Sequence, residues 1–414
     1  MSKVKLYSEI GTLEGVILHP PGPEVENMTP KNAERALYSD ILNLAVARKE
    51  YNQLECALQQ ITNTYRVGDL LRDVLRSNEV REKIVKRTCY NERRPELVDY
   101  LLDQEPGELS RLLIQGVPLQ RDTLTNFLSQ ENFALRPLHN FFFTRDASIA
   151  IHDRVLIGKM ASRVRERESV IMEAIFNYHP VLRTQTVVAD DTDIAGNKIS
   201  IEGGDILVAR EDILLIGIGS RTSTQGVDFI MNQVKKEKRP FHIIVQELPE
   251  KPESFIHLDM VFTMLDHDMC MVYEPLILRP NKYETVHIGI DNGRVSTIAT
   301  VDNIPTILKK LGMDLQPAFC GGSEDLNIQE REQWHSGANF FAVGPGKVMG
   351  YNRNLNTLED LNKKGFEIIK ARDLLNGKAT LDHQDKYVLT IDGSELARGG
   401  GGARCMTMPF RRSE

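Results

Sequence analysis

The stretch DILVAREDILLIG, residues 205–217, sets two short apolar runs on either side of the polar turn 210–212. This order of strand, polar turn and strand predicts a β-hairpin. The order recurs along the chain, twice clearly and twice more weakly, in units that begin at residues 146, 205, 259, 339 and 405. Helical stretches such as 163–177 and 225–237 lie between the hairpins. A degenerate repeat of this kind predicts an α/β fold built from similar units.

The first polar residue of each unit has a geometric consequence. The clear repeats are DASIAIHDRVLIG and DMVFTMLDHDMCMVY, the weaker ones are NFFAVGPGKVMGY and CMTMP, and LEGVILHP at 13–20 supplies a related strand. If the units are equivalent, their opening residues lie at the same end of a closed, propeller-like ring. We therefore expect residues far apart in the sequence to meet at one site, namely Asp146, Asp205, Asp259 and Cys405.

Two regions near the amino-terminal side have a helical pattern without hairpins. Residues 29–61 show apolar residues at helical spacing, with Thr29 as a cap and Pro30 in the first turn. Residues 70–130 repeat leucines at helical intervals between charged residues, and they carry no β signal. We predict that 70–130 is an all-helical insertion within one catalytic domain spanning 1–414.

Composition excludes several classes of protein. The 414 residues carry a formal net charge of −7, with a sequence pI of about 5.9, and no block of Lys and Arg is dense. The nearest to one, VKKEKRP at 234–240, is typical of a solvated helix end. A nucleic-acid binder would usually present a basic face, so no nucleic-acid partner is expected. The longest clean apolar run, ILLIGIG at 213–219, is too short to cross a bilayer, so no membrane partner is expected either.

The cysteines and the amino terminus indicate a reducing compartment. Five cysteines in a long chain form no CxxC pair and no disulfide-like framework, and MSKVKLYSEI resembles no export signal. We therefore expect free thiols and a cytoplasmic protein. No segment reads as an interface, so a homo-oligomer is compatible with the sequence without being indicated by it.

Three short motifs place acids beside the predicted strands: FTRD (143–146), IEGGD (201–205) and HLD (257–259). Alone, the Asp146 carboxylate would be read as bonding to its own turn, and IEGGD as a simple turn. In a strand, however, His257 and Asp259 project to the same face, which gives the histidine an acidic neighbour.

The chain places its most permissive backbone directly before a thiol, in GGGGARCMTM at 399–408. A cysteine and a histidine suffice for nucleophilic catalysis, but several acids around them call for a positively charged substrate. A guanidinium is the best geometric match, because its planar fork pairs with carboxylates. A phosphate loop is excluded, because Pro409 leaves no following helix. Zinc on His257, Asp259 and Cys405 is disfavoured, since no second Cys/His cluster exists, and we expect no metal and no organic cofactor.

Taken together, FTRD, EGGD, HLD and the carboxy-terminal GGARCM resemble the arginine deiminases of the guanidino-group-modifying superfamily. The resemblance covers essentially the whole chain and includes PLHNFFFTRD, GSRTSTQGVDF, REQW and the helical insertion. It implies a pentein-like, five-bladed α/β-propeller of ββαβ units. It also implies a hydrolase that converts L-arginine to L-citrulline and ammonia through a covalent alkylthiouronium on the cysteine. The alternatives are another guanidino substrate, such as agmatine or a methylated arginine, and a non-catalytic arginine-binding protein of the same fold.

The resemblance further implies roles for the matching residues. Cys405 would be the nucleophile and His257 the general acid and base, while three acids would hold the guanidinium: Asp146, Asp259 and Glu202. The amino-acid end of the substrate would be bound by Asn140, Phe143, Arg165, Arg221 and Gly402. In one respect the chain departs from some relatives, which carry an arginine where this sequence has Gly400 or Gly401. This leaves the pH dependence and the gating of the loop open.

Overall fold

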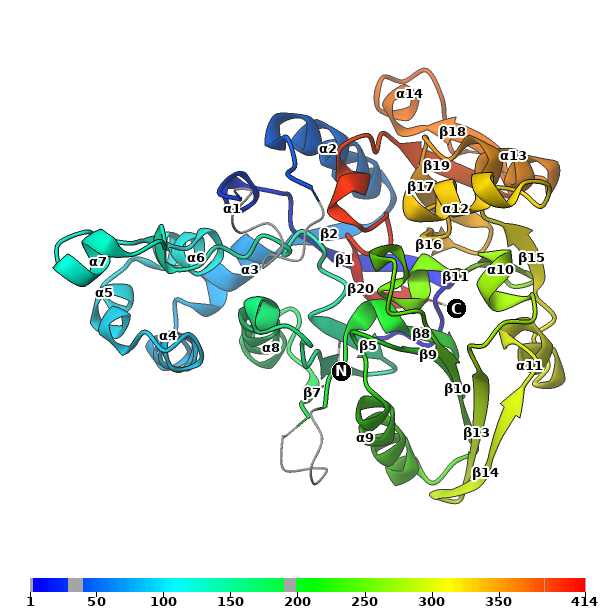
Figure 1. The fold of residues 1–414 in the computed structure, drawn as a ribbon, viewed down its shortest axis with the longest axis horizontal. Helices are drawn as coiled ribbons and strands as arrows, with labels where there is room; N and C mark the ends of the chain where they lie inside the picture. Colours follow the sequence, from blue (N-terminus) through cyan, green and yellow to red (C-terminus); the bar gives the residue numbers. More distant parts are fainter. Residues whose placement is uncertain (1–2, 29–39, 190–198, 383, 414) are drawn as a thin grey trace.

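The structure is a computed structural model that describes residues 3–28, 40–189, 199–382 and 384–413. Its architecture is α/β, as predicted, and the hairpins of the sequence repeat form the first two strands of separate small sheets (Figure 1). The stretch that begins at Asp146 forms an antiparallel pair, β5 (Ser148–Ile151) and β6 (Arg154–Ile157). Helix α8 (Glu166–Tyr178) then leads to β7 (Gln185–Val187), which pairs with β6 in parallel.

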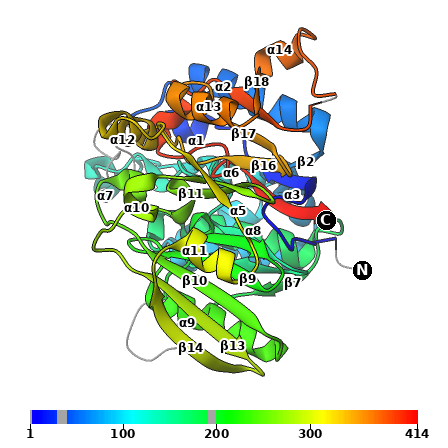
Figure 2. The same cartoon turned by 90° about the vertical axis from the view of Figure 1, so that its right-hand side faces the viewer.

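The second and third units repeat this order with additions. The hairpin of residues 205–217 and its parallel partner comprise β8 (Ile206–Arg210), β9 (Ile213–Ile218), α9 (Thr224–Val234) and β10 (Phe241–Glu247). A long hairpin, β13 (Thr285–Asp291) with β14 (Arg294–Val301), extends this sheet and projects at the bottom of Figures 1 and 2. The third sheet consists of β11 (Phe262–Asp266), β12 (Met269–Val272) and β15 (Gln316–Phe319), with α10 (Glu274–Ile277) and α11 (Ile304–Lys310) in the connection.

The fourth and fifth units include the two weaker sequence repeats. The fourth sheet has the order β16-β17-β19-β18, from β16 (Phe341–Gly344), β17 (Lys347–Tyr351), α13 (Leu355–Lys363), β18 (Glu367–Lys370), α14 (Ala371–Leu375) and β19 (Tyr387–Ile391). Helix α12 (Leu326–Trp334) precedes it. The fifth sheet joins both ends of the described chain: β20 (Met408–Ser413) pairs antiparallel with β1 (Thr12–Leu18), which pairs in parallel with β2 (Asn63–Arg66) after α2 (Leu44–Ile61).

The region predicted to be all-helical forms a lobe at the left of Figure 1. Its helices are α3 (Val67–Val74), α4 (Asn78–Asn91), α5 (Val98–Leu102), α6 (Pro106–Gln115) and α7 (Leu124–Leu128). The expectation of no β structure is wrong at one point. After Gly116, whose φ of +86° ends α6, the chain extends as β3 (Val117–Pro118) and pairs with β4 (Phe133–Leu135).

Within the described residues, the helix predicted over 29–61 is shorter than expected. Helix α2 begins at Leu44, where the Asn43 side chain accepts a hydrogen bond from the Val46 amide at 3.2 Å and so caps the first turn. The predicted cap Thr29 lies outside the described residues. A short helix, α1 (Pro23–Glu26), precedes this gap, and the helices predicted over 163–177 and 225–237 are confirmed as α8 and α9.

Candidate active site

The segments that open the five sheets are linked by hydrogen bonds that run from each unit to the next. Asp146 Oδ1 accepts from the Gly204 amide at 3.1 Å, and Asp205 Oδ1 accepts from the Leu258 amide at 3.0 Å. The circuit continues through the third, fourth and fifth units and returns to the first, by way of Asn339 Nδ2 to the Asp259 carbonyl, the Cys405 amide to Asn339 Oδ1, and the Arg145 amide to the Cys405 carbonyl. The circuit brings the unit openings at Asp146, Asp205, Asp259 and Cys405 together, as the repeat predicts, and their action as one site stays a prediction.

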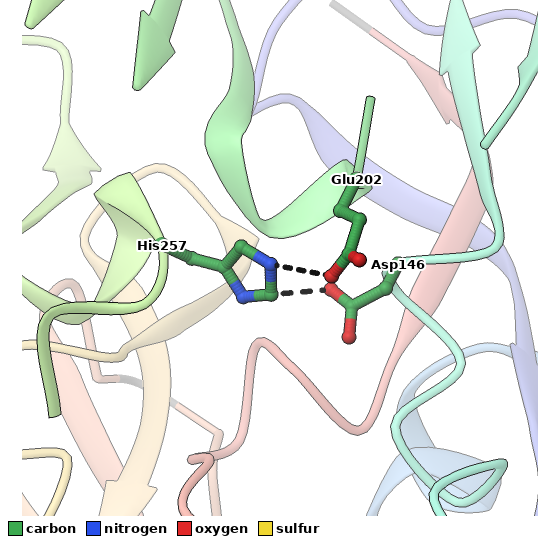
Figure 3. A group of neighbouring side chains, drawn as sticks. All are labelled: Asp146, Glu202 and His257. Carbon is green, nitrogen blue, oxygen red and sulfur yellow. Dashed lines mark hydrogen bonds and ion pairs between the residues drawn. The ribbon is translucent and has the colours of Figure 1, made fainter. Parts of the chain in front are cut away.

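His257 lies at the start of a 3-10 turn, Leu258–Met260, and is 2% exposed. Its Nε2 is 3.0 Å from Glu202 Oε2, and its Nδ1 is 3.8 Å from Asp146 Oδ1, so both ring nitrogens face carboxylates (Figure 3). Burial alone would lower the pKa of His257. The negative charges of Asp146, Glu202 and Asp205 outweigh burial and raise this pKa to about 9. The imidazole is therefore protonated at neutral pH, with Nε2 donating to Glu202 and Nδ1 in a longer ion pair with Asp146.

Glu202 is fully buried and held on both carboxylate oxygens. Its Oε1 accepts from the Ala161 amide at 3.0 Å and lies 3.8 Å from Arg221 Nη1, while Oε2 bonds to His257. Burial would raise the pKa of Glu202, but the hydrogen bond from His257 and the charge of Arg221 lower it to about 2. Glu202 is therefore ionised, and it orients the imidazole.

Cys405, the predicted nucleophile, is 4% exposed. Its Sγ lies 3.7 Å and 3.8 Å from the two carboxylate oxygens of Asp259 and 3.2 Å from Asn339 Nδ2. Burial, followed by the negative charges of Asp259 and Asp146, raises the pKa of the thiol well above its ordinary value. Without a bound cation, Cys405 is therefore a neutral thiol.

Arg404 neutralises the acid beside the thiol. It is 1% exposed, its Nη1 lies 2.8 Å from Asp259 Oδ2, and its Nε and Nη2 bond to Glu9 at 3.0 Å and 3.1 Å. Burial opposes charging, yet Glu9 and Asp259 raise the pKa of Arg404, and Arg404 in turn lowers the pKa of Glu9 to about 2. The ion pairs fix Asp259 in place and leave its second oxygen facing Sγ.

Arg165 makes a corresponding contact with the other aspartate. Its Nη1 lies 2.6 Å from Asp146 Oδ2 and 3.9 Å from Glu202 Oε2, and its Nε and Nη2 bond to Glu168. Its Nη2 also donates to the Asn140 and Phe143 carbonyls at 3.4 Å and 3.3 Å. A guanidinium, although one belonging to the protein, is thus already bound at the predicted guanidinium site.

The predicted site residues surround a small cavity of about 30 Å³, room for about two water molecules. It is lined by Asn140, Phe143, Asp146, Arg165, Arg221, Ile256, His257, Gly399, Gly400, Gly401 and Cys405. Three predicted residues lie behind this wall. Glu202 backs His257, Asp259 backs Cys405, and a Cβ on Gly402 would lie only 2.7 Å from the Asn339 side chain.

The glycine run closes the cavity by close packing. Gly400 has a φ of +84°, which favours glycine. A Cβ on Gly401 would lie 2.6 Å from the Phe143 ring and 3.0 Å from the Cys405 Cβ. The Tyr351 hydroxyl donates to the Gly401 carbonyl at 2.8 Å and fixes the loop from behind.

Several site residues were missed by the sequence reasoning. Asn339 contacts the Cys405 sulfur, Glu9 pairs with Arg404, and Glu168 pairs with Arg165. Arg404 was likewise given no role. Asn339 had a usable signal, because it opens the fourth repeat as Asp146, Asp205 and Asp259 open the first three. Glu168 follows Arg165 by three residues on a predicted helix, a spacing typical of ion pairs.

Asp146, Glu202 and His257 also offer one ligand atom each within 4.8 Å of one another, a spacing that suits a metal ion as well as an organic cation (Figure 3). In the described structure, Asp146 Oδ2 is occupied by Arg165 and Glu202 Oε2 by His257. The cations that these acids hold here are therefore nitrogen groups of planar, hydrogen-bonding side chains.

The known sequences that this chain resembles share one name. The sequence model of a family described as arginine deiminase matches residues 34–412. A protein from Limosilactobacillus fermentum named arginine deiminase is 32% identical over 100% of this chain and 99% of its own length. Arginine deiminases from Bacillus cereus (31%) and Streptococcus agalactiae (30%) match over 99% of this chain and over 99% and 98% of their own lengths, respectively.

Solved structures share the fold at lower identity. SxtG, an amidinotransferase from Microseira wollei, gives a TM-score of 0.57 at 13% identity, covering 100% of this chain and 98% of its own. The N-terminal domain of ArgZ, a cyanobacterial arginine dihydrolase, gives 0.53 at 13%, covering 96% and 97%. DDAH from Pseudomonas aeruginosa gives 0.51 at 14%, covering 96% and 100%.

Among the described residues, no helix combines the length and apolar character needed to cross a membrane.

Proposed function

This chain belongs to the arginine deiminase family, and from that premise we propose that it hydrolyses L-arginine to L-citrulline and ammonia with Cys405 as the nucleophile. One observation carries the assignment of residues. A buried thiol, a protonated imidazole and an aspartate already gripping a guanidinium line one cavity. The acids select a cation, and the thiol and imidazole supply the chemistry.

Binding begins with an exchange of guanidinium groups. The cavity is too small for the substrate while Arg165 bonds to Asp146, so the guanidinium of arginine displaces that of Arg165. Asp146 and the Asp259 oxygen that Arg404 does not hold, Oδ1, then bind the substrate nitrogens. The released Arg165, with Arg221, meets the substrate α-carboxylate at the open end. Asn140 and Phe143 border its amino-acid part, and the backbone near Gly402 completes the loop over it.

The bound cation changes the ionisation of the thiol. Its positive charge offsets the two carboxylates that raise the Cys405 pKa, so the thiol releases its proton to water. The thiolate attacks the guanidinium carbon and forms a C–S bond. His257 donates a proton to the departing nitrogen as the C–N bond breaks. Ammonia leaves, and an alkylthiouronium cation stays on Cys405.

The second half of the reaction reverses the role of the histidine. Neutral His257 takes a proton from water while the hydroxyl adds to the thiouronium carbon. The C–S bond then breaks, the carbonyl of citrulline forms, and the remaining proton of that water returns to sulfur. Glu202 holds the imidazole in place throughout.

The arrangement of the sheets supports a ring around this site. We interpret the five sheets, each an antiparallel pair extended by a parallel strand, as the blades of a five-bladed α/β-propeller. The hydrogen-bond circuit through the five unit openings would be its inner rim. In this interpretation, residues 1–414 form one catalytic domain, and the helices within 70–130 are an insertion outside the ring.

A citrulline assay tests the function and the substrate together. With arginine, agmatine and N-methylated arginine offered at equal concentration, we expect citrulline from arginine and little product from agmatine, which has no carboxylate for Arg165 and Arg221. Mass spectrometry of enzyme quenched during turnover should find the adduct on the peptide containing Cys405. Turnover without any adduct, together with full activity of Cys405→Ser, would contradict the covalent route.

A further inference from the structure

A second and much larger cavity, of about 460 Å³, lies between the helical lobe and α8. Its volume is in the range of small-molecule sites. The wall comes from the end of α4, the stretch around 130–140 and the segment 163–170, and its polar groups include Asn91, Glu92, Arg136, Asn140, Arg163 and Arg167. The proposed reaction uses none of these except Asn140.

Arg167 is the unusual member of this wall. It is 3% exposed, and only its Nη2 makes a hydrogen bond, to the Arg136 carbonyl. Its Nη1 has an ion pair at 3.6 Å with Glu92 Oε1, and its Nε and Nη1 find no hydrogen-bond partner among the described residues. Burial lowers the pKa of Arg167. A buried guanidinium with donors left unsatisfied is costly. Its Nε and Nη1 are closed to solvent here, so an acceptor brought by a ligand would offset that cost once the side chain turns toward the cavity.

The charges around the cavity favour an anion. Four arginines (Arg93, Arg136, Arg163 and Arg167) face three glutamates (Glu92, Glu131 and Glu166). All three glutamates are already engaged, Glu92 with Arg167 at 3.6 Å, Glu131 with Arg136 at 3.3 Å and Glu166 with Asn91 Nδ2 at 3.1 Å. The groups in excess are therefore guanidinium donors, which pair best with planar or tetrahedral oxyanions.

We propose that this cavity binds a small molecule through an oxyanion group, a carboxylate or a phosphate, held by Arg167 and Arg163. The site is separate from the reacting centre but shares a wall with it. Asn140 borders both cavities, and Arg163 belongs to the same 3-10 turn, Arg163–Arg165, as the arginine that grips Asp146. Glu168, one residue beyond Arg167, holds Arg165. A ligand here therefore bears on the element that must release Arg165 before substrate binds.

The test is a binding measurement that does not depend on turnover. Isothermal titration of the full chain with inorganic phosphate, and separately with succinate, distinguishes the two sources of oxyanion. We expect saturable binding of at least one probe, weakened about tenfold or more by Arg167→Gln through the loss of a charged hydrogen bond. Arg163→Gln, at an exposed position, should weaken binding without unfolding the protein, which keeps the test valid if Arg167→Gln proves unstable.

Two controls decide the location. Arg87→Gln alters an arginine of α4 that pairs with Glu173 and is absent from the cavity wall. This variant should leave binding unchanged. Binding should also persist in Cys405→Ala saturated with L-arginine. Absence of saturable binding by both probes, equal affinities in wild type and Arg163→Gln, or full displacement of the probe by arginine would each overturn the proposal.

Discussion

The two proposed reacting groups, His257 and Cys405, both lie among buried acids. These acids favour the charged form of the imidazole and the neutral form of the thiol. The imidazole half of the site (His257, Glu202, Asp146) and the thiol half (Cys405, Asp259, Arg404) each combine a reactive side chain with buried acid. Around His257 the acids stabilise the charged form and raise its pKa to about 9. Around Cys405 they destabilise the charged form and raise the pKa of the thiol well above its ordinary value. The proposed acid catalyst is thus protonated before substrate arrives, whereas the proposed nucleophile is still a neutral thiol.

Each half also has an arginine on its aspartate, and the two arginines differ in what else holds them. Arg404 is clamped between Asp259 and Glu9 and bonds to the Ile206 carbonyl at 2.9 Å. Arg165 is held by Glu168 and by two carbonyls, but it borders the cavity, whereas Arg404 does not. In the proposed exchange, the imidazole half therefore contains the cation that moves, and the thiol half contains a fixed one.

Removing the proposed nucleophile should have the largest effect on activity. Cys405→Ala should lower citrulline formation by about 10⁴-fold or more, since the bond-forming group is lost. Its far-UV circular dichroism should match that of wild type. Cys56→Ala, at a half-buried helical position outside the cavity, is the matched control and should retain activity. Substantial citrulline from Cys405→Ala would refute the assignment.

Neutralising the acid of the thiol half should expose the suppressed nucleophile. Asp259→Asn removes a charge that raises the Cys405 pKa and frees the charge of Arg404, so the thiol pKa should fall. Alkylation of Cys405 by iodoacetamide as a function of pH measures this directly. The same variant should lose about 10²- to 10³-fold in kcat/KM, because the substrate loses a charged hydrogen-bond partner. A thiol pKa equal to or above that of wild type would show that Asp259 is not what keeps the thiol neutral.

Neutralising Glu202, an acid of the imidazole half, should shift the alkaline limb of the kcat/KM profile to lower pH. Glu202 raises the His257 pKa, so Glu202→Gln should lower it from about 9 toward the ordinary 6.5. The proton donor is then lost at lower pH, and the alkaline limb of the kcat/KM profile should move down. At pH 8.5 the deficit should exceed that at pH 6 by about tenfold. A uniform loss at all pH values would indicate that Glu202 only positions the ring.

The smallest expected effect concerns the loop that joins the two halves. Gly401→Ala places a Cβ against the Phe143 ring and the Cys405 Cβ, which should shift the thiol and lower kcat/KM by about tenfold. Its unfolding midpoint should change little, because the Phe143 ring borders the cavity and can move into it. Gly68→Ala in α3, where no atom lies within 4 Å of the added Cβ, is the control and should leave turnover unchanged. Equal effects of both variants would argue against a catalytic role for the tight loop.

The sequence was most informative where position in the repeat carried meaning. The opening residues Asp146, Asp205 and Asp259 could be placed together because each precedes a hairpin of the same pattern. Asn339 holds the equivalent place in the fourth unit, yet its side chain is uncharged and was not predicted to belong to the site. Its Oδ1 nevertheless accepts the Cys405 and Arg404 amides, and its Nδ2 contacts sulfur. A search by repeat position would have found it, whereas a search by titratable residue type did not.

Other features had no local signal. Nothing near Arg165 in the sequence shows that its guanidinium turns to Asp146, because that contact depends on how the turn before α8 folds back onto the start of its own unit. The pairing of Arg404 with Glu9 joins residues at opposite ends of the chain and cannot be read from spacing. The β3–β4 pair arises because Gly116 turns the chain back beside residues 133–135, a tertiary effect that outweighs the helical pattern around it.

The fifth sheet has a consequence for how the molecule becomes competent. Thr12 pairs with Ser413 across β1 and β20, so the strand directly after Cys405 finds its partner only by closing almost the whole chain into a loop. Contacts of such long separation form late and slowly, because the entropy of closure must be overcome first. The sulfur is thus anchored by the pairing that is hardest to make, and the rate at which citrulline production returns during refolding should report the last step of assembly.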